Sequence, residues 1–518
     1  MIRGGGQNPM KSVGRECSAT GPGESGCAMR IFRSAVLPLI LAISPTILAA
    51  CATVQNGQVN AQVDSRLVET IDGYVRNRDF NGVVLVANAE GVITHQARGM
   101  SSLEQGTELG PDDVFRVGSL TKPITAVLVL TLVNEGRLRL DGTLGQYLPE
   151  LYADTPASGV TVEQLLSHTS GLKDVPANYT DPFWQSAARQ TFTPEAFAKA
   201  WIPPEISSPP GKWRYNNNGF YVLGLIVERV TDKSYADALH QRVLAPAGMT
   251  HSGVYDVGTV VPHLASGYAR SNFGVMERPM TIDPTVSYAA AGIYSTANDL
   301  LAFSKALANE QLLPAALKAR MFADDGDQYG LGWGIERWAT TDDALMTVQT
   351  HTGSIPGYQS LFVRADDGTV VIILDNYWQG ATVIEMGRAL FAIAHGAPAR
   401  NPKRLLSDLL TPIAARDGVD AMEIAFRSAP TEGADAYDVS EGALNSLGYS
   451  LLRKGMKDPA LRVFEWNVAA HPQSANVHDS LGEAYLSVGR KDDARRSYEN
   501  ALRLDPTSTS AKAALAGL

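Results

Sequence analysis

Residues 115–136 read "FRVGSLTKPITAVLVLTLVNEG", and their fold and chemistry depend on one pair of polar residues. The apolar run 126–133 suits a buried helix, and Ser119 and Lys122 stand at its entrance. Because residues three apart share a helix face, the two side chains can meet. Burial lowers the pKa of a lysine, which can then take the proton of a serine nucleophile. Pro123 disfavours helical geometry at the residue before it, so we expect the helix to begin almost at Ser119.

The same spacing occurs once more, in "LLSHTSGLK", between Ser170 and Lys173. There Gly171 follows the serine, and no apolar helix begins. Turn residues surround this second pair, so we interpret His168 and Ser170 as structural. Spacing alone therefore does not identify a nucleophile, and other motifs are needed.

Two further motifs follow in order. "KWRYNNNGFYVLGLIVERV" places Tyr215 and Asn217 in a polar loop that leads into a helix. "VQTHTGSIPGYQSLFV" places His351, Thr352 and Gly353 beside a predicted strand. Tyrosine is a candidate general acid and base, and a strand edge can line a cleft.

Ser-x-x-Lys, Tyr-x-Asn and His-Thr-Gly, in that order and in those settings, resemble the serine β-lactamase and penicillin-binding-protein family. This family includes class C β-lactamases, D-alanyl-D-alanine carboxypeptidases and related esterases. The resemblance covers residues 63–395. It implies a mixed α/β domain with an antiparallel sheet, flanking helices and a helical lobe.

The resemblance also implies roles for the motif residues. Ser119 would be the acylated nucleophile, Lys122 its proton partner and Tyr215 the second general base and acid. The backbone N–H groups of Ser119 and Ser354 would form the oxyanion hole. The substrate-binding residues would be Asn217, His351, Thr352 and Gly353. No metal and no organic cofactor are implied, and the substrate stays open between an ester, an amide, a D-amino-acid peptide and a β-lactam.

His351 departs from the family pattern, because relatives that handle carboxylate-bearing substrates usually have lysine there. An unperturbed histidine has a pKa of about 6.5 and is mostly neutral at pH 7. We therefore expect uncharged esters to be turned over better than carboxylate-bearing β-lactams. The gap should narrow as pH falls toward about 6 and the imidazole gains its proton.

The strand pattern supports one large domain between residues 63 and 395. "NGVVLVANAEGVITHQARG" near its start and "SLFVRADDGTVVIILDN" near its end each read as an antiparallel hairpin. Helical stretches lie between them, including residues 219–230 and 297–308. We expect one sheet whose middle connection carries a helical lobe, with the site in the cleft between them.

A Pro-rich linker at 396–404 marks a boundary at which few contacts are expected. Beyond it, residues 405–518 form a helical region that resembles the tetratricopeptide repeat, with copies at about 438–471 and 472–505. We expect these copies to pack on a helical stretch at 405–429 and to end in a capping helix. The repeats suggest a protein partner.

Residues 1–51 resemble a leader with a signal sequence for export. A Gly- and Ser-rich leader precedes an uncharged stretch that is too short to span a bilayer comfortably. It ends in "LAAC", which resembles the bacterial lipobox, so Cys51 would be lipidated and anchor the protein in the periplasm or cell envelope. The start could be Met1 or Met29, and a plain signal peptide or an uncleaved anchor are the alternatives.

Composition narrows the function classes. The 518-residue chain is 45% hydrophobic and has a formal net charge of −10, which suits a large folded enzyme and not a nucleic-acid-binding protein. All three cysteines precede residue 52, so no disulfide framework is available to the folded region. The expected function is an exported serine hydrolase acting through an acyl-enzyme. The alternative is a sensor or scaffold that captures cell-wall peptide and recruits a partner through the repeats.

Overall fold

The computed structural model describes residues 45–176, 181–271, 273–341, 344–378, 382–433 and 436–518, with the backbone alone for residues 45–60. Residues 56–518 form one compact unit. Most of the predicted leader lies outside the described residues, and Cys51 falls in helix α1 (Pro45–Arg78), where its side chain is not described. Within these ranges, no helix combines the length and the apolar character needed to cross a membrane.

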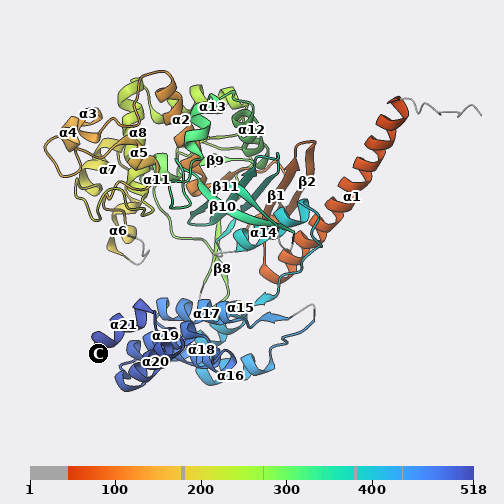
Figure 1. The fold of residues 1–518 in the computed structure, drawn as a ribbon, viewed down its shortest axis with the longest axis vertical. Helices are drawn as coiled ribbons and strands as arrows, with labels where there is room; N and C mark the ends of the chain where they lie inside the picture. Colours follow the sequence, from red (N-terminus) through yellow and green to blue (C-terminus); the bar gives the residue numbers. More distant parts are fainter. Residues whose placement is uncertain (1–44, 177–180, 272, 342–343, 379–381, 434–435) are drawn as a thin grey trace, which may run out of the picture. The chain divides into compact units, whose positions relative to one another are not determined.

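Six antiparallel strands form the central sheet, in the order β10-β11-β12-β13-β1-β2 (Figure 1). Their bounds are β10 Gly334–Thr341, β11 Ala344–Ile355, β12 Tyr358–Ala365, β13 Val370–Asp375, β1 Gly82–Asn88 and β2 Gly91–Arg98. The predicted hairpins are confirmed as β1–β2 and β12–β13. The two ends of the domain meet where β1 pairs with β13, with Val84 opposite Ile373.

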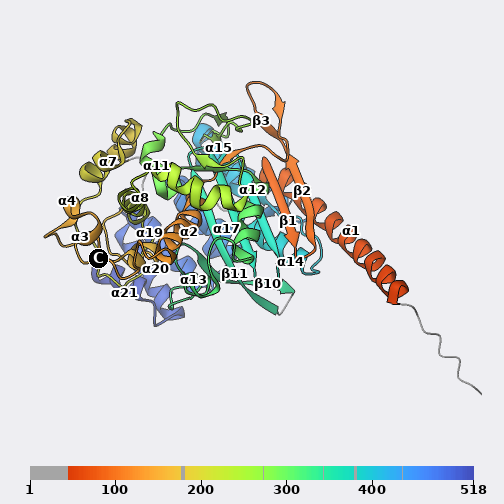
Figure 2. The same cartoon turned by 90° about the horizontal axis from the view of Figure 1, so that it is seen from above.

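Strand β1 is apolar from Gly82 to Ala87 because both faces of this strand are buried. Side chains alternate between the faces of a strand. Val83 and Leu85 join the core formed with α2 (Thr121–Asn134) and α12 (Ala297–Ala308). Val84 joins a second core, formed with α1 and α14 (Thr382–Ala394). The view from above places α12 and α14 on either side of β1 (Figure 2).

The connection between β2 and β10 carries the helical lobe, as expected. Its main helix beside α2 is α8 (Asn217–Thr231), and α3, α4, α5 and α7 gather next to α8 (Figure 1). The shorter helices are α3 Leu144–Tyr147, α4 Pro149–Tyr152, α5 Val162–Leu166, α6 Pro182–Gln185, α7 Pro194–Trp201, α9 Tyr235–Leu239, α10 Ala245–Ala247, α11 Pro284–Ala291 and α13 Ala315–Met321. Short strands in this connection are β3 Met100–Ser102, β4 Thr107–Glu108, β5 Phe115–Arg116, β6 Gly253–Val254, β7 Tyr268–Arg270, β8 Met276–Glu277 and β9 Ile293–Ser295, and β14 Tyr377–Trp378 follows the sheet. The mixed α/β fold class is confirmed.

The C-terminal region repeats one helix pair 34 residues apart. Helices α17 (Glu441–Arg453) and α18 (Lys457–Ala470) recur as α19 (Ala475–Ser487) and α20 (Lys491–Leu504). In each pair a glycine lets the partner ring approach: a Cβ on Gly448 would lie 2.5 Å from Phe464, and one on Gly482 would lie 2.6 Å from Tyr498.

The predicted flanking helices are also confirmed. The stretch after the linker forms α15 (Leu406–Asp417) and α16 (Val419–Ser428), and their apolar side chains share a core with the first repeat. Helix α21 (Thr509–Ala516) packs on the last repeat through Ala511. Strands β15 (Arg404–Leu405) and β16 (Tyr437–Asp438) pair in parallel beside them.

The linker makes more contacts than its composition predicts, so that expectation was wrong. Arg66 donates to the carbonyls of Gly396 and Ala397 at 3.0 and 2.8 Å. Asn77 donates to the carbonyl of Pro402 at 2.8 Å, and Arg78 donates to the carbonyl of Lys403. Residues 396–403 are thus bound along helix α1, because that helix carries long polar side chains on one face.

Candidate functional site

Ser119 lies in a short 3₁₀ helix, η1 (Gly118–Leu120), that leads directly into α2. Pro123 is the third residue of α2, where its missing N–H would have no partner within the helix. Gly118 has a positive φ of 54°, and a Cβ there would lie 2.9 Å from the backbone nitrogen of Ser354. A glycine therefore allows η1 to approach the end of β11 closely.

Lys122 is 0% exposed, and its Nζ has three oxygen neighbours. They are Ser119 Oγ at 3.0 Å, Asn217 Oδ1 at 2.9 Å and the carbonyl oxygen of Ala290 at 3.0 Å. Burial lowers the pKa of Lys122 from 10.5 to about 7, against a smaller opposing effect of the Asp174 carboxylate. The amine is thus poised to gain and lose a proton near neutral pH.

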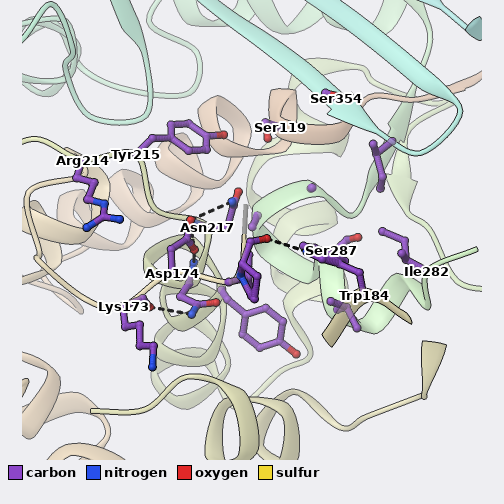
Figure 3. Close-up of a pocket in the computed structure, with 18 of the residues that line it drawn as sticks. Ser119, Lys173, Asp174, Trp184, Arg214, Tyr215, Asn217, Ile282, Ser287 and Ser354 are labelled. Atoms are coloured by element: carbon purple, nitrogen blue, oxygen red, sulfur yellow. Dashed lines mark hydrogen bonds between the residues drawn. The ribbon is translucent and has the colours of Figure 1, made fainter. Parts of the chain in front are cut away.

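Tyr215 precedes Asn216, the N-cap residue of α8, and lines the same cavity as Ser119. Its ring centroid lies 4.8 Å from Lys122 Nζ. Its hydroxyl points toward Ser119 (Figure 3). The structure therefore brings together the three side chains to which the resemblance assigns proton transfer.

Strand β11 presents its motif residues alternately to the cavity and to the core. Thr352 and Ser354 line the cavity, whereas His351 and Gly353 are buried. A Cβ on Gly353 would lie 2.0 Å from the carbonyl oxygen of Val117, so this glycine lets the strand pass η1. Gly353 is thus a packing residue here, outside the cavity lining.

His351 is buried beside strand β12 and lies among aromatic side chains. Its Nδ1 lies 2.6 Å from the carbonyl oxygen of Thr352 and its Nε2 lies 3.1 Å from the Tyr329 hydroxyl. Burial, aided by the nearby Lys122, lowers the pKa of His351 to about 3. The expectation that it gains a proton near pH 6 was wrong, because this side chain is enclosed by aromatic residues and by Lys122.

The second serine–lysine pair has a different environment. Ser170 is buried, but the Lys173 side chain is 59% exposed and its Nζ lies 3.9 Å from Glu205. His168 accepts a hydrogen bond from the backbone N–H of Asn216 at 3.1 Å, and its ring packs 4.4 Å from that of Tyr215. These contacts agree with the structural role predicted for His168 and Ser170.

Sequence reasoning missed two partners of the central pair, Asp174 and the carbonyl of Ala290. Asp174 accepts hydrogen bonds from the loop that carries Asn217. The Ala290 carbonyl reaches Lys122 because α11 is distorted at Tyr288, with φ 35° and ψ −129°. Asp174 and Ala290 both lie far from Lys122 in the sequence. Every residue has a backbone carbonyl, so the residue type does not indicate which carbonyl contacts Lys122.

The cavity in front of Ser119 has a volume of about 960 Å³. Trp184, Ile282 and Val286 contribute apolar surface, and Trp184 and Ile282 lie together on one side (Figure 3). The charged lining residues are Lys173, Arg214, Asp174 and Glu205, two of each sign. Across the described ranges, no group of three His, Cys, Asp or Glu side chains is placed to hold a metal ion.

Known proteins are similar to this chain in sequence and in fold. Esterase EstB of Burkholderia gladioli is 29% identical over 362 residues, covering 61% of this chain and 91% of that protein. A penicillin binding protein from Bacillus halodurans is 25% identical with a TM-score of 0.54, covering 62% of this chain and 98% of that one. A D-stereospecific amidohydrolase from Streptomyces sp. matches with the same identity, TM-score and coverage.

Family models match both parts of the chain. A Tetratricopeptide repeat model matches residues 475–508, which overlap the second predicted copy at about 472–505. The Beta-lactamase model matches residues 67–394, more than half of the 518 residues. The chain therefore belongs to the β-lactamase family of serine hydrolases, as its three ordered motifs predicted.

Proposed function

We propose that this protein is an exported serine hydrolase that forms an acyl-enzyme on Ser119. Its preferred substrates are uncharged esters and amides, including those of D-amino acids. Similarity to an esterase and to a D-stereospecific amidohydrolase supports both reaction types. Both proceed through the same attack on a carbonyl carbon, so one site serves for either.

The observation that carries this proposal is the set of partners around Lys122 Nζ. Two of them, Asn217 Oδ1 and the Ala290 carbonyl, can only accept hydrogen bonds. A neutral amine has two protons and one lone pair. When both protons go to these acceptors, the lone pair faces Ser119 Oγ, 3.0 Å away, and can take the hydroxyl proton.

The mechanism follows from this geometry. Ser119 Oγ attacks the carbonyl carbon while its proton passes to Lys122. The backbone N–H groups of Ser119 and Ser354 stabilise the developing oxyanion, and Gly118 permits their close approach. Lys122 passes this proton through Tyr215 to the leaving group, which departs as its bond to the carbonyl carbon breaks and leaves the acyl group on Ser119. Water then attacks the acyl carbon, its proton passes through the same side chains to Ser119 Oγ, and the acid product leaves.

The cavity favours uncharged substrates. His351 is neutral at all pH values near neutrality, so it offers no cation to a substrate carboxylate. Lysine and arginine in the cavity lining are matched by an equal number of acidic residues. The apolar surface at Trp184 and Ile282 suits an aliphatic or aromatic group.

Covalent labelling tests the proposal. A fluorophosphonate should add once, and peptide mass spectrometry should place the adduct on Ser119. S119A should lose the adduct and turnover with a melting temperature within a few degrees of wild type, since a hydroxyl in an open cavity contributes little to stability. S170A, in the other serine–lysine pair, is the matched control and should keep both the adduct and the turnover. Absence of an adduct on folded wild-type protein refutes the proposal.

Export, lipid attachment and partner binding belong to the same proposal. The "LAAC" stretch supports cleavage and lipidation at Cys51, and the repeats support recruitment of a protein partner at the cell envelope. Metabolic labelling with palmitate, compared between wild type and C51S in a bacterial host, tests the anchor. Equal labelling of the two proteins would rule it out.

A further inference from the structure

Asp174 contacts the start of helix α8 through both carboxylate oxygens. Its Oδ1 accepts the backbone N–H groups of Asn217 and Asn218 at 2.9 and 3.1 Å. Its Oδ2 accepts the side-chain Nδ2 of Asn217 at 3.3 Å. One oxygen therefore caps the helix backbone, and the other accepts from the side chain of Asn217 (Figure 3). That side chain also contacts Lys122.

The contact with Asn217 has a direction. A carboxylate can only accept hydrogen bonds, so the amide of Asn217 must turn its NH₂ toward Asp174. Its oxygen then faces Lys122, 2.9 Å from Nζ. The reverse orientation would place NH₂ against the amine of Lys122, and that amine would lose one of its two acceptors.

Asp174 is an acidic residue, which distinguishes it from the other titratable residues described around Lys122. The other titratable groups in the described surroundings are Tyr215, whose ring faces Nζ, and His168 and His351. Burial and the Lys122 charge lower the pKa of both histidines, so they are neutral when the enzyme works. Asp174 is the carboxylate that raises the pKa of Lys122.

We propose that Asp174 is a positioning residue, which fixes the Asn217 amide with its oxygen toward Lys122 and so aims the base at Ser119. This inference rests on the proposed function for its effect on turnover. The orientation itself is independent of turnover and can be measured without it.

The isosteric variant D174N separates orienting from helix capping. Its amide oxygen can still accept the two backbone N–H groups, whereas its NH₂ faces Nδ2 of Asn217. Two donors cannot share that contact, so the Asn217 amide turns over. We expect kcat/KM for a neutral ester to fall about 10- to 100-fold with little change in melting temperature. The acidic limb of the pH profile should move to lower pH, because loss of a nearby negative charge lowers the pKa of Lys122.

E205Q is the matched control, since Glu205 lines the same cavity but is exposed and paired with Lys173. It should leave the acidic limb of the pH profile unshifted, because the exposed charge of Glu205 is screened by solvent. A shift in E205Q as large as that in D174N would mean that cavity charge alone is responsible, and it would overturn the proposal.

A second readout does not need turnover. Protein labelled with ¹³C at lysine Cε gives the Lys122 titration by NMR, with the signal assigned by its loss in K122R. The midpoint should move down in D174N and back up in D174N/N217D, which places a carboxylate directly beside the amine. Unchanged titration together with near wild-type kcat/KM in D174N would overturn the proposal. Absence of a Ser119 adduct in wild type would refute the proposed function alone, because the Lys122 titration is measured without acylation.

Discussion

At the scale of single residues, the burial of Lys122 lowers the stability of the folded protein at low pH and supplies an amine that titrates near neutral pH. Its pKa is lowered from 10.5 to about 7 in the folded protein. The unfolded chain therefore binds more protons than the folded one between these two values, and stability should rise with pH across that window. Below it the folded protein carries a buried ammonium, a destabilising feature that an enzyme tolerates where a base is needed.

The first prediction concerns this base. For a neutral ester, kcat/KM should rise through about pH 7 as Lys122 loses its proton. K122R should lower kcat/KM by about 10³-fold or more, because a guanidinium cannot be deprotonated in a protein. The control K173R changes the exposed lysine of the other pair and should leave the pH profile unchanged. A profile that is flat from about pH 5.5 to 8.5 would show that Lys122 is not the base.

A second prediction follows from the burial of His351. Since the pKa of its imidazole is about 3, the ratio of ester to carboxylated β-lactam turnover should not change with pH through this residue. H351K should place a second cation beside Lys122 and move the acidic limb of the profile to lower pH. The test is to measure turnover of the ester and of the carboxylated β-lactam in wild type and H351K, over the same pH range as in the first prediction. A ratio that falls toward pH 6 in wild type alone would mean that the imidazole protonates after all.

At the scale of elements, η1 and β11 have to meet closely enough for two backbone N–H groups to face one oxyanion. Glycines at both sides permit this: Gly118 faces Ser354, and Gly353 faces the carbonyl of Val117. The hydroxyl of Ser360 donates to that same carbonyl at 2.8 Å and ties η1 to the sheet. The proposed oxyanion site thus depends on the packing of two elements.

The third prediction tests this packing. In G118A the new methyl group would lie 2.9 Å from the Ser354 nitrogen, so η1 and β11 must separate. We expect kcat to fall about 10²- to 10³-fold, the usual effect of losing an oxyanion donor. G136A is the matched control, since Gly136 also has a positive φ, 69°, but nothing lies within 4 Å of its Cβ position. G136A should be destabilised by about 1 kcal/mol because of its positive φ, and it should keep its activity. G118A should lose more stability than G136A, because its methyl group also clashes with the backbone of Ser354. If G118A and G136A have equal activity, the close approach of Gly118 to Ser354 is not needed for catalysis.

These two scales also show how far the sequence could predict the site. The proximity of Ser119 to Lys122 follows from helix geometry, and the two hairpins of the sheet follow from apolar runs that are separated by turn residues. The protonation state of His351 could not be predicted, because it depends on Tyr329 and Lys122, which come from other parts of the chain. Asp174 was hidden for the same reason, since it lies 43 residues from Asn217 in the chain.

At the scale of the whole molecule, the linker belongs structurally to the hydrolase domain up to Lys403. Thr70, Asn77 and Arg78 of α1 bind its backbone, and Arg78 is itself buried. Arg404 behaves differently, because its strand pairs with Tyr437 in the C-terminal region. The boundary between the two regions therefore lies near residue 403, although the Pro-rich composition begins earlier.

The last prediction compares two truncated proteins. A chain that ends at Lys403 should be soluble and keep wild-type kcat/KM, because the residues that meet at the cavity all precede the linker. A chain that ends at His395 should also be active when folded, but it loses the backbone acceptors of Arg66, Asn77 and Arg78. At about 1 kcal/mol for each hydrogen bond, we expect the free energy of unfolding to be lower by about 2–4 kcal/mol than in the longer chain. Denaturant melts of both proteins, with ester turnover measured in parallel, test this. A folded but inactive chain ending at Lys403 would show that the repeats contribute to the active site, because the linker contacts are intact in that protein.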